Sequence, residues 1–425
     1  MGDPSPEAWS RVQRYASWMH HVHVNELSVL GEETFRKLRL NSPASGWFPA
    51  LQDLSWSISK SNHPYASLFF SSPNLKRVDI SVVPYSWSGS EVPHKVLPAI
   101  TSVIAALPTP TLQDLSVDVD CHEISSAHYK DSLSSVILRC GPSFTRFSSP
   151  IPLSDSAINH LIHLPHLRIW HTEHPPPNYS ASSLPLVFPP LRDFSLGEDA
   201  ARGWLSLFKR LGNRVSSTQH TTPLSRIKES LESLIIESFP DLTIDVSFAS
   251  TIQTFRNLNH LNVTVHCHRP RDGGIQCAFK LNNESVTELA MALPQLESLL
   301  LGYPCYKNTC VTTIACLLPI SVHCVKLRSL EIHFNTTDIV DDLRMISEDP
   351  RFQELRLLPK CAISRLDVYR IPLALDESEF ETVANGMTDI FPYLERCDGF
   401  DGIWNGLNEK IAELQGIPLV QADRL

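Results

Sequence analysis

Phe48-Pro-Ala-Leu51-Gln-Asp-Leu54-Ser-Trp56 contains a degenerate L-x-x-L-x-L pattern that returns along the whole chain. This recurrence is typical of leucine-rich repeats, in which each unit adds one short strand to a growing sheet. The mean spacing of the copies is about 31 residues, close to the length of such a unit. Further copies lie at Met19/Val22/Val24, Leu75/Val78/Ile80, Leu112/Leu115/Val117, Phe144/Phe147, Leu164/Leu167/Ile169, Leu191/Phe194/Leu196, Leu231/Leu234/Ile236, Leu258/Leu261/Val263, Leu296/Leu299/Leu301, Leu327/Leu330/Ile332, Ile363/Leu366/Val368 and, in part, Leu394.

Helical patterns precede several of these copies. In residues 97–107, 155–162, 284–291 and 377–387, apolar side chains recur every three to four positions, and a proline follows before or within the next strand phrase. A strand, a crossover helix and a parallel strand wind right-handed, so such units stack into one sheet. The sequence therefore predicts an α/β leucine-rich-repeat solenoid, a horseshoe with a parallel β-sheet on its concave face and helices on its convex face.

The repeats are expected to form a single body. We predict that residues 19–400 form one solenoid of about 12–13 irregular units without an internal domain boundary. Both ends of a solenoid need a cover over the exposed core layer. Residues 1–18 carry an amphipathic stripe that includes Trp9 and Trp18, which predicts a cap or a stub against which another module packs. Residues 401–425 are predicted to form a C-terminal capping helix and tail.

Alternation along each strand assigns side chains to the two faces of the predicted sheet. In Leu115-Ser116-Val117-Asp118, the apolar side chains point into the core and the polar ones to the concave side. We predict that a protein partner binds this concave face, although water-exposed strands need polar residues in any case. The predicted partner-binding residues are Asp53, Ser55, Arg77, Asp79, Asp114, Ser116, Asp118, Arg168, Trp170, His171, Asp193, Glu331, His333, Asp367 and Tyr369.

Two aromatic residues in that set are the predicted anchors of the interface. Trp170 and Tyr369 are favoured because aromatic side chains contribute much of the binding energy at protein interfaces. The sequence is equally compatible with either ring packing beneath a loop.

Composition and charge limit the other classes of partner. The chain has 42% hydrophobic and 19% charged residues and a formal net charge of −10. A negative net charge disfavours nonspecific binding to nucleic acid and to anionic membranes, and no stretch is apolar enough to span a bilayer. No secretory leader pattern begins the sequence, so we expect a cytoplasmic or nuclear monomer whose ten cysteines are free thiols.

Motifs for catalysis are missing from the sequence. It contains no phosphate-binding G-x-x-x-x-G-K-[ST] loop, no G-x-G-x-x-G turn and no G-x-S-x-G nucleophile motif. Cys305, Cys310, Cys316, His323 and Cys324 are the nearest approach to a metal site, but their spacing lacks the C-x-x-C pair of a zinc knuckle. Free cysteine is also a common core residue. We therefore expect neither an enzyme nor a bound metal or cofactor.

Residues 48–56, 68–78 and 106–115, with Arg14-Tyr15-Ala16-Ser-Trp-Met19, resemble the leucine-rich region of F-box proteins from basidiomycete fungi. The resemblance covers nearly the whole chain as repeat phrasing, with no invariant site. It implies a receptor that recognises substrates for ubiquitination. In that family an N-terminal F-box docks on a Skp-type adaptor of a cullin ubiquitin ligase. Only about eighteen residues precede the first repeat here, so the sequence departs from the family at the F-box, which we expect to be absent.

Three functions remain open at this point. The first is substrate recognition for an F-box-type ubiquitin ligase, with a Skp-type adaptor as partner only if an F-box lies upstream. The second is a ligase-independent leucine-rich-repeat scaffold that binds a protein. The third, less favoured, is a metal-dependent enzyme that uses the Cys/His cluster in residues 305–324.

Overall fold

The structure is a computed structural model that describes residues 5–24, 37, 40, 46–58, 72–82, 104–105, 107, 109–119, 127–173, 175–176, 188–215, 224–238, 242–265, 277–302, 310–368, 375–398 and 402–416. The contacts divide the chain into two compact units, Met1–Leu191 and Arg192–Leu425. The predicted continuity of residues 19–400 as one solenoid stays a prediction. The predicted helix at 97–107 falls largely outside the described residues.

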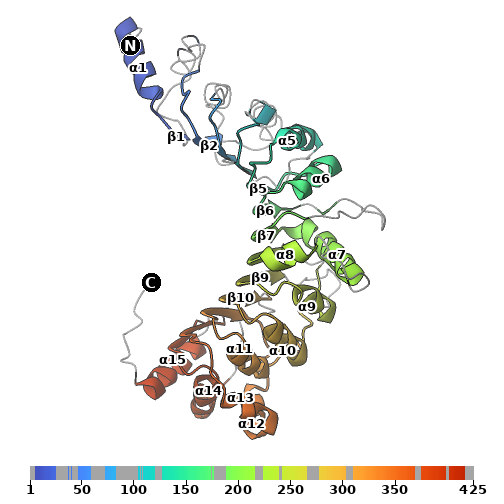
Figure 1. Cartoon of the computed structure of the whole chain (residues 1–425). Helices are drawn as coiled ribbons and strands as arrows, with labels where there is room; N and C mark the ends of the chain where they lie inside the picture. Colours follow the sequence, from blue (N-terminus) through green and yellow to red (C-terminus); the bar gives the residue numbers. More distant parts are fainter. Residues whose placement is uncertain are drawn as a thin grey trace, which may run out of the picture. The chain divides into compact units, whose positions relative to one another are not determined.

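In the described part of the first unit, strands and helices alternate between Asp114 and Thr172, and these helices lie on one side of the strands (Figure 1). Helix α1 precedes the sheet, and α5 and α6 lie side by side behind the strands. Its described elements are α1 (Pro6–Ala16), β1 (His21–Val24), β2 (Asp53–Ile58), β3 (Arg77–Val82), β4 (Asp114–Val119), α5 (Ala127–Arg139), β5 (Arg146–Ser149), α6 (Asp155–His163) and β6 (Ile169–Thr172).

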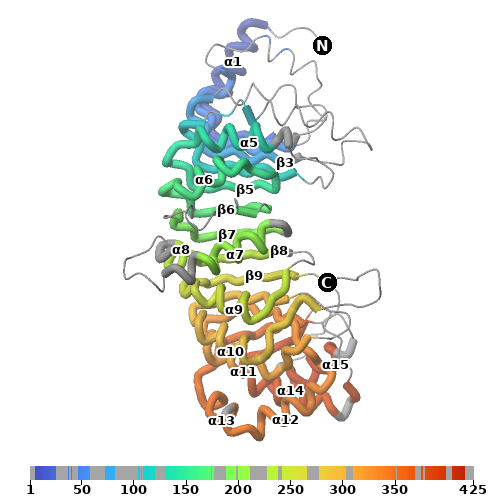
Figure 2. Tube along the Cα trace, turned by 90° about the vertical axis from the view of Figure 1, so that its right-hand side faces the viewer, coloured from blue at the N-terminus to red at the C-terminus, as the bar shows by residue number. Residues whose placement is uncertain are grey.

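The second unit repeats the arrangement of strands and helices, and Figure 2 shows β7, β8 and β9 as successive neighbours. Its described elements are β7 (Asp193–Leu196), α7 (Glu198–Val215), α8 (Leu224–Ser230), β8 (Ser233–Ser238), α9 (Val246–Ile252), β9 (His260–Val265), α10 (Asn283–Ala292), β10 (Ser298–Leu301), a 3-10 turn (Ile314–Cys316), α11 (Leu317–His323), β11 (Ser329–Ile332), α12 (Ile339–Glu348), α13 (Pro350–Arg356), β12 (Arg365–Asp367), α14 (Glu377–Ile390), β13 (Arg396–Asp398) and α15 (Gly402–Gln415).

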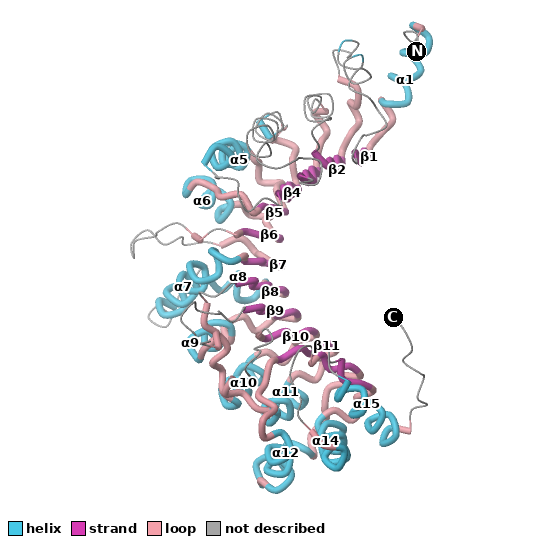
Figure 3. Tube along the Cα trace, turned by 180° about the vertical axis from the view of Figure 1, so that it is seen from behind, coloured by secondary structure: helices cyan, strands magenta, loops and turns pink. Residues whose placement is uncertain are grey.

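Within each unit every strand pairs in parallel with the strand next to it in sequence. Parallel neighbours need a crossover, and the helices that supply it lie on one face of the strands, as Figure 3 shows for α5 and α6 and for α7, α9, α10 and α11. The predicted α/β class with a parallel sheet is therefore confirmed within each unit. The opposite strand face carries no described helix over β8–β11.

Backbone hydrogen bonds join the turn before each strand to the start of the strand in the following repeat. The carbonyl of Gln52 accepts from the N–H groups of Lys76 at 2.7 Å and Arg77 at 2.9 Å. In the second unit, the carbonyl of Glu232 accepts from Asn259 at 2.7 Å and His260 at 3.0 Å. Because one carbonyl has two lone pairs, this shared acceptor satisfies two donors of the following strand start. The recurrence makes the turns equivalent even where their side chains differ.

The apolar triplets of the repeats form the core. Leu54, Leu115, Leu234 and Leu299 are each at most 2% exposed, and each sits opposite an equivalent side chain on the neighbouring strand. A column of aliphatic side chains from successive strands excludes water from the space between strands and helices. The predicted core positions are thus correct in these units.

One repeat has a different phase from the predicted one. Leu164, Leu167 and Ile169 were predicted to lie in the core. Leu164 and Leu167 are buried, but Ile169 is only half-buried, and the buried residues of β6 are Trp170 and Thr172. Trp170 pairs in register with the core residue Phe147. Leu164, Leu167 and Trp170 are spaced equally by three, so the sequence pattern fits two phases, and side-chain packing selects the second.

Side-chain caps define where several helices begin. Ser154 accepts from the N–H of Ala157 at the start of α6, and Asn282 accepts from the N–H of Ser285 at the start of α10. Each cap satisfies a helix N–H that has no intrahelical partner. No helix in the described part of the chain is long and apolar enough to cross a bilayer.

Candidate functional site

The candidate site is the strand face that carries the polar side chains, here called the open face. Strand residues alternate between this face and the core, as in β4, where Asp114 and Ser116 are half-buried between the buried Leu115 and Val117. The alternation follows from the pleat, which turns successive side chains to opposite sides. Each unit therefore presents in-register rows of side chains that run across its strands.

The first row of the first unit alternates in charge. His21, Asp53, Arg77, Asp114 and Arg146 occupy equivalent positions on β1 to β5. Nδ1 of His21 lies 2.5 Å from Oδ2 of Asp53, and Nε of Arg77 lies 3.2 Å from Oδ2 of Asp114 and 3.9 Å from Oδ1 of Asp53. These exposed or half-exposed pairs contribute little to stability, but they leave the row close to neutral.

The second row of the first unit is polar and small. Ser55, Asp79, Ser116, Ser148 and His171 face the same side on β2 to β6. The hydroxyl of Ser148 lies 3.4 Å from Nδ1 of His171. The hydroxyls and the carboxylate of this row can form hydrogen bonds with a partner. The row offers little apolar surface, so a partner that covers it gains little free energy from apolar burial.

The second row of the second unit, here called the central row, differs in chemistry. It runs in register through Ser195, Ile235, Asn262, Leu300, Glu331, Asp367 and Asp398, on β7 to β13. Ile235 and Leu300 are half-buried apolar side chains on a face that is otherwise polar. The row therefore changes from apolar on β8 and β10 to acidic on β11 to β13.

Glu331 is the most perturbed acid on this face. Burial first, and the charge of the neighbouring Asp367 second, raise the pKa of Glu331 to about 7. Leu300 sits in register on its other side and offers no polar group to the carboxylate. Among the described residues, no cation lies within ion-pair distance of Glu331. An ionised Glu331 thus costs free energy that a nearby cation would offset.

Asp398 has a different environment at the end of the same row. The guanidinium groups of Arg365 and Arg396 both form ion pairs with its carboxylate. These two cations therefore offset the charge of Asp398, whereas no described cation forms an ion pair with Glu331.

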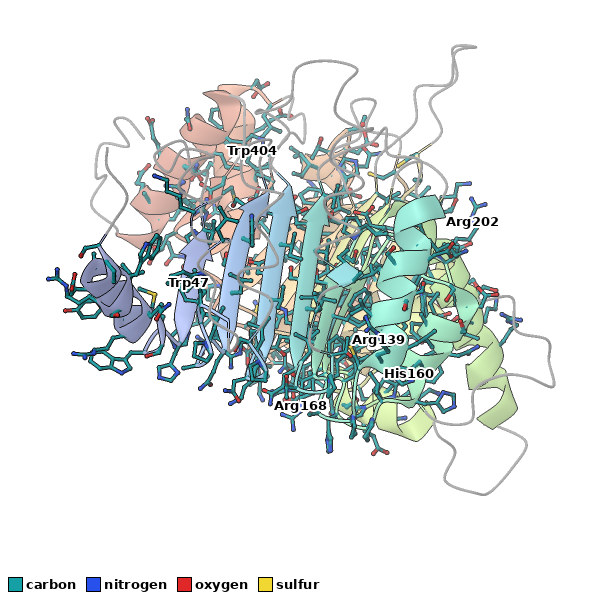
Figure 4. All side chains as sticks on the ribbon, turned by 90° about the horizontal axis from the view of Figure 1, so that it is seen from above. Trp47, Arg139, His160, Arg168, Arg202 and Trp404 are labelled. Atoms are coloured by element: carbon teal, nitrogen blue, oxygen red, sulfur yellow. The ribbon has the colours of Figure 1, made fainter. Side chains whose placement is uncertain are left out.

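The structure moves three predicted binding residues away from the open face. Trp170 is fully buried on the core side of β6, so its ring is not offered to a partner. His333 follows β11 and is only 4% exposed. Arg168 lies in the turn directly before β6, beside the amino ends of the strands (Figure 4). The expectation of open-face placement is wrong for these three, because two are enclosed by packing and one stands outside the strand.

The remaining predicted residues lie where the alternation placed them. Their side chains are half-buried or exposed on the open faces of the two units, except that Tyr369 lies outside the described residues. Those on the first unit are Asp53, Ser55, Arg77, Asp79, Asp114, Ser116, Asp118 and His171, and those on the second unit are Asp193, Glu331 and Asp367.

Sequence reasoning missed Ile235 and Leu300. Both stand inside apolar runs, Leu234-Ile235-Ile236 and Leu299-Leu300-Leu301, in which the repeat pattern assigns only the first and last residue to the core, and the predicted binding residues were chosen among polar and aromatic side chains. Strict alternation places the middle residue of each run on the open face, and that parity was the available signal.

The described cysteines of the candidate metal cluster lie in the protein core. Cys310, Cys316 and Cys324 are buried, and burial raises the pKa of the Cys324 thiol to about 12 and that of Cys316 still further. Cys305 lies outside the described residues. No group of three or more metal-ligating side chains occurs in the parts of the chain that the structure describes. The described thiols therefore have the environment of small hydrophobic core residues.

A groove of about 870 Å³ follows the turns at the amino ends of β8 to β11. Glu232, Glu297, Arg256 and Lys326 bring both signs of charge to its walls, together with several amides. Glu232 is already paired with Arg192, and Lys326 donates to the amide of Gln295 at 2.5 Å. Its mixed charge favours no single class of ligand, so the central row remains the better candidate.

No protein-family model matches the chain, and no curated protein sequence matches it significantly. The functional assignment therefore depends on the site itself and on the resemblance in repeat phrasing.

Proposed function

We propose that this protein is a leucine-rich-repeat solenoid that binds another protein through the open face of its second unit. By the resemblance to fungal F-box proteins, its partner would be a substrate for ubiquitination. The observation that carries the proposal is the central row, in which half-buried apolar and acidic side chains share a strand face over which no described helix lies.

Physical reasons favour binding over catalysis at this face. Apolar side chains on a water-facing strand gain free energy when a partner covers them, about 25 cal/mol for each Å² of apolar area. The neighbouring carboxylates add selectivity by charge. In contrast, no group of three or more metal-ligating side chains occurs among the described residues.

The solenoid architecture is supported by the parallel pairing of consecutive strands and by the shared-carbonyl ladder at the strand starts. Stacked units bury a continuous core and leave one broad surface, which suits recognition of a protein better than of a small molecule.

Affinity capture from cells tests the binding proposal. The tagged full chain is compared with Leu300→Ser and with Leu357→Ser, since Leu357 is an 88% exposed leucine in the same unit away from the strands. We expect Leu300→Ser to lose specific partners that the wild type and Leu357→Ser retain. Identical partner profiles for all three chains would overturn the assignment of the open face.

The link to ubiquitination needs a separate measurement. A purified Skp-type adaptor is mixed with the full chain, and complex formation is followed by size-exclusion chromatography. Complex formation supports the ligase-receptor function. No complex, together with partners lost in Leu300→Ser, supports the alternative of a ligase-independent scaffold, which needs only the open face.

A further inference from the structure

The central row also specifies what kind of segment would bind, an inference that rests on the proposed function. Three of its residues lie on alternate strands: Ile235 on β8, Leu300 on β10 and Asp367 on β12. Neighbouring strands are about 4.8 Å apart, so residues on alternate strands are separated by about 9.6 Å. The row thus offers two apolar contacts and one acidic contact at nearly equal intervals.

A polyproline II helix matches this interval. It has three residues per turn and rises about 3.1 Å per residue, so side chains three residues apart share one face and are about 9.3 Å apart. A β-strand ligand fits less well, because residues three apart point to opposite sides. The spacing of the row therefore fits a ligand with contact residues at positions i, i+3 and i+6.

The backbone of such a ligand also needs hydrogen bonds, because it has none of its own. Asn262 lies on β9 between Ile235 and Leu300, and its Oδ1 already accepts from the hydroxyl of Thr264 at 3.1 Å. This contact engages Oδ1, so the Nδ2 group is the part of the amide that can donate to a ligand. A carbonyl of a ligand crossing β9 is a suitable acceptor.

The acidic end of the row selects a cation. Glu331 lies on β11 between Leu300 and Asp367, is half-buried and has no described cationic neighbour within ion-pair distance. Its raised pKa reports the cost of keeping that carboxylate ionised. Arg365 and Arg396 contact Asp398 instead. A guanidinium from a ligand at this place can contact Glu331 and Asp367 together, which a planar fork of donors allows.

We propose that the central row binds a proline-rich segment in the polyproline II conformation, with apolar residues at i and i+3 against Ile235 and Leu300 and an arginine at i+6 against Glu331 and Asp367. The segment crosses the strands of the second unit nearly at right angles. Its restricted backbone lowers the entropy lost on binding, which favours a proline-rich partner over a flexible one.

The test uses a fluorescein-labelled peptide, Leu-Pro-Pro-Leu-Pro-Pro-Arg, and fluorescence anisotropy with the purified full chain. Two peptides serve as matched probes: Leu-Pro-Pro-Leu-Pro-Pro-Glu reverses the charge, and Leu-Pro-Pro-Pro-Leu-Pro-Arg keeps the composition but changes the apolar spacing. We expect the first peptide to bind at least about tenfold more tightly than either probe. Equal binding of the three, or no binding of the first, would overturn the proposal.

Protein variants locate the site. Glu331→Gln preserves shape and is expected to weaken binding of the arginine peptide about tenfold while leaving the glutamate peptide unaffected or stronger. Leu300→Ser and Ile235→Ser are both tested, so that a folding defect in one leaves the other to decide; Leu357→Ser is the control. Wild-type binding by Glu331→Gln and by both serine variants would place the peptide elsewhere and contradict the proposal.

The capture experiment keeps the two levels of the proposal distinct. If no peptide binds but Leu300→Ser loses its cellular partners, the open face binds proteins of another kind, and only the polyproline inference is wrong. If the peptide binds at the central row but cellular partners are unchanged by Leu300→Ser, the ligand class is correct and the proposed function fails.

Discussion

The side-chain amide of Asn408 bridges the two backbone polar groups of Cys397. The N–H of Cys397 donates to Oδ1 of Asn408 at 2.6 Å, and Nδ2 of Asn408 donates to the carbonyl of Cys397 at 2.8 Å. Cys397 is the middle residue of β13, which pairs with β12 on its other side, and Asn408 belongs to α15, which packs against β13 and α14. One amide thus replaces a missing strand neighbour and closes an edge that would otherwise expose unpaired backbone.

Replacing this amide should destabilise the second unit. Asn408→Ala leaves the N–H and carbonyl of Cys397 without their partner, and we expect a loss of about 1–3 kcal/mol in the free energy of unfolding, measured by urea denaturation. Asn385→Ala, an exposed asparagine on α14, is the control. Equal stability of the two variants would show that the bridge contributes nothing.

A glycine with a positive φ should be intolerant of a side chain. Gly302 has φ +98°, and an added Cβ would lie 3.0 Å from Cβ of His333 and 3.4 Å from Cδ2 of Phe279. Gly302→Ala should therefore cost more than the roughly 1–2 kcal/mol of the backbone conformation alone. Gly416→Ala is the matched control, because Gly416 has φ +63° but no atom within 4 Å of the added Cβ. Equal thermal shifts for both variants would contradict the contact.

Trp170 should behave as a core residue. It is fully buried, so Trp170→Ala should lower the free energy of unfolding by about 3–5 kcal/mol, as measured by chemical denaturation. Trp18→Ala is the comparison, because Trp18 is 65% exposed and its removal should change stability by about 0.5 kcal/mol or less. A stable Trp170→Ala variant that loses a binding partner would instead restore its role as an interface anchor.

Glu331 should make stability depend on pH. Its pKa is raised from the ordinary value to about 7 in the folded chain, so the folded state binds more protons than the unfolded state between about pH 4.5 and pH 7. The stability contributed by the protonated acid is therefore present at low pH and lost as the pH rises through about 7. Asp367, in register on β12, is the charged neighbour that adds to this effect, whereas β10 presents only Leu300.

Glu331→Gln tests that dependence directly. The variant should be more stable than the wild type at pH 8 and similar to it at pH 4, as followed by urea denaturation at a series of pH values. Glu354→Gln, at an exposed position on α13, is the control and should change the profile little. A difference between wild type and Glu331→Gln that is constant with pH would contradict the assignment.

The buried cysteines should resist labelling until the chain unfolds. Burial raises the pKa of the Cys140, Cys324 and Cys397 thiols to about 12 and that of Cys361 to about 11, so few thiolates form at neutral pH. Iodoacetamide treatment followed by peptide mapping should modify these residues only in denaturant. Rapid labelling of any of them in the native chain would show that its strand or helix opens.

Much of the core could be predicted from sequence because every repeat must bury apolar side chains at the same positions of its strand. A strand residue such as Leu115 or Leu234 must be apolar in every unit, since its neighbours on both sides are apolar and water is excluded. Helices at 155–162, 284–291 and 377–387 were predictable for the same reason, and the structure has α6, α10 and α14 there. These features depend on local periodicity, which the chain carries directly.

The errors arose where local periodicity allows two answers. The equal spacing of Leu164, Leu167 and Trp170 permits two phases, and only packing against Phe147 decides that Trp170 is in the core. Leu300 was not among the predicted binding residues, because it lies in an apolar run between two core leucines and carries no polar group. The pleat turns it outward, and its neighbours on other strands then determine its role.

The sequence by itself determined a parallel α/β repeat-like architecture and its core, because a recurring hydrophobic pattern must bury one face of every repeat. Only the tertiary structure decided which side chains from distant units share a row. Four strands of the second unit, each in a different repeat, supply Ile235, Leu300, Glu331 and Asp367. The parallel register of these strands places the four side chains in one row. Register is a property of hydrogen bonds between strands, so no single segment of the chain contains it.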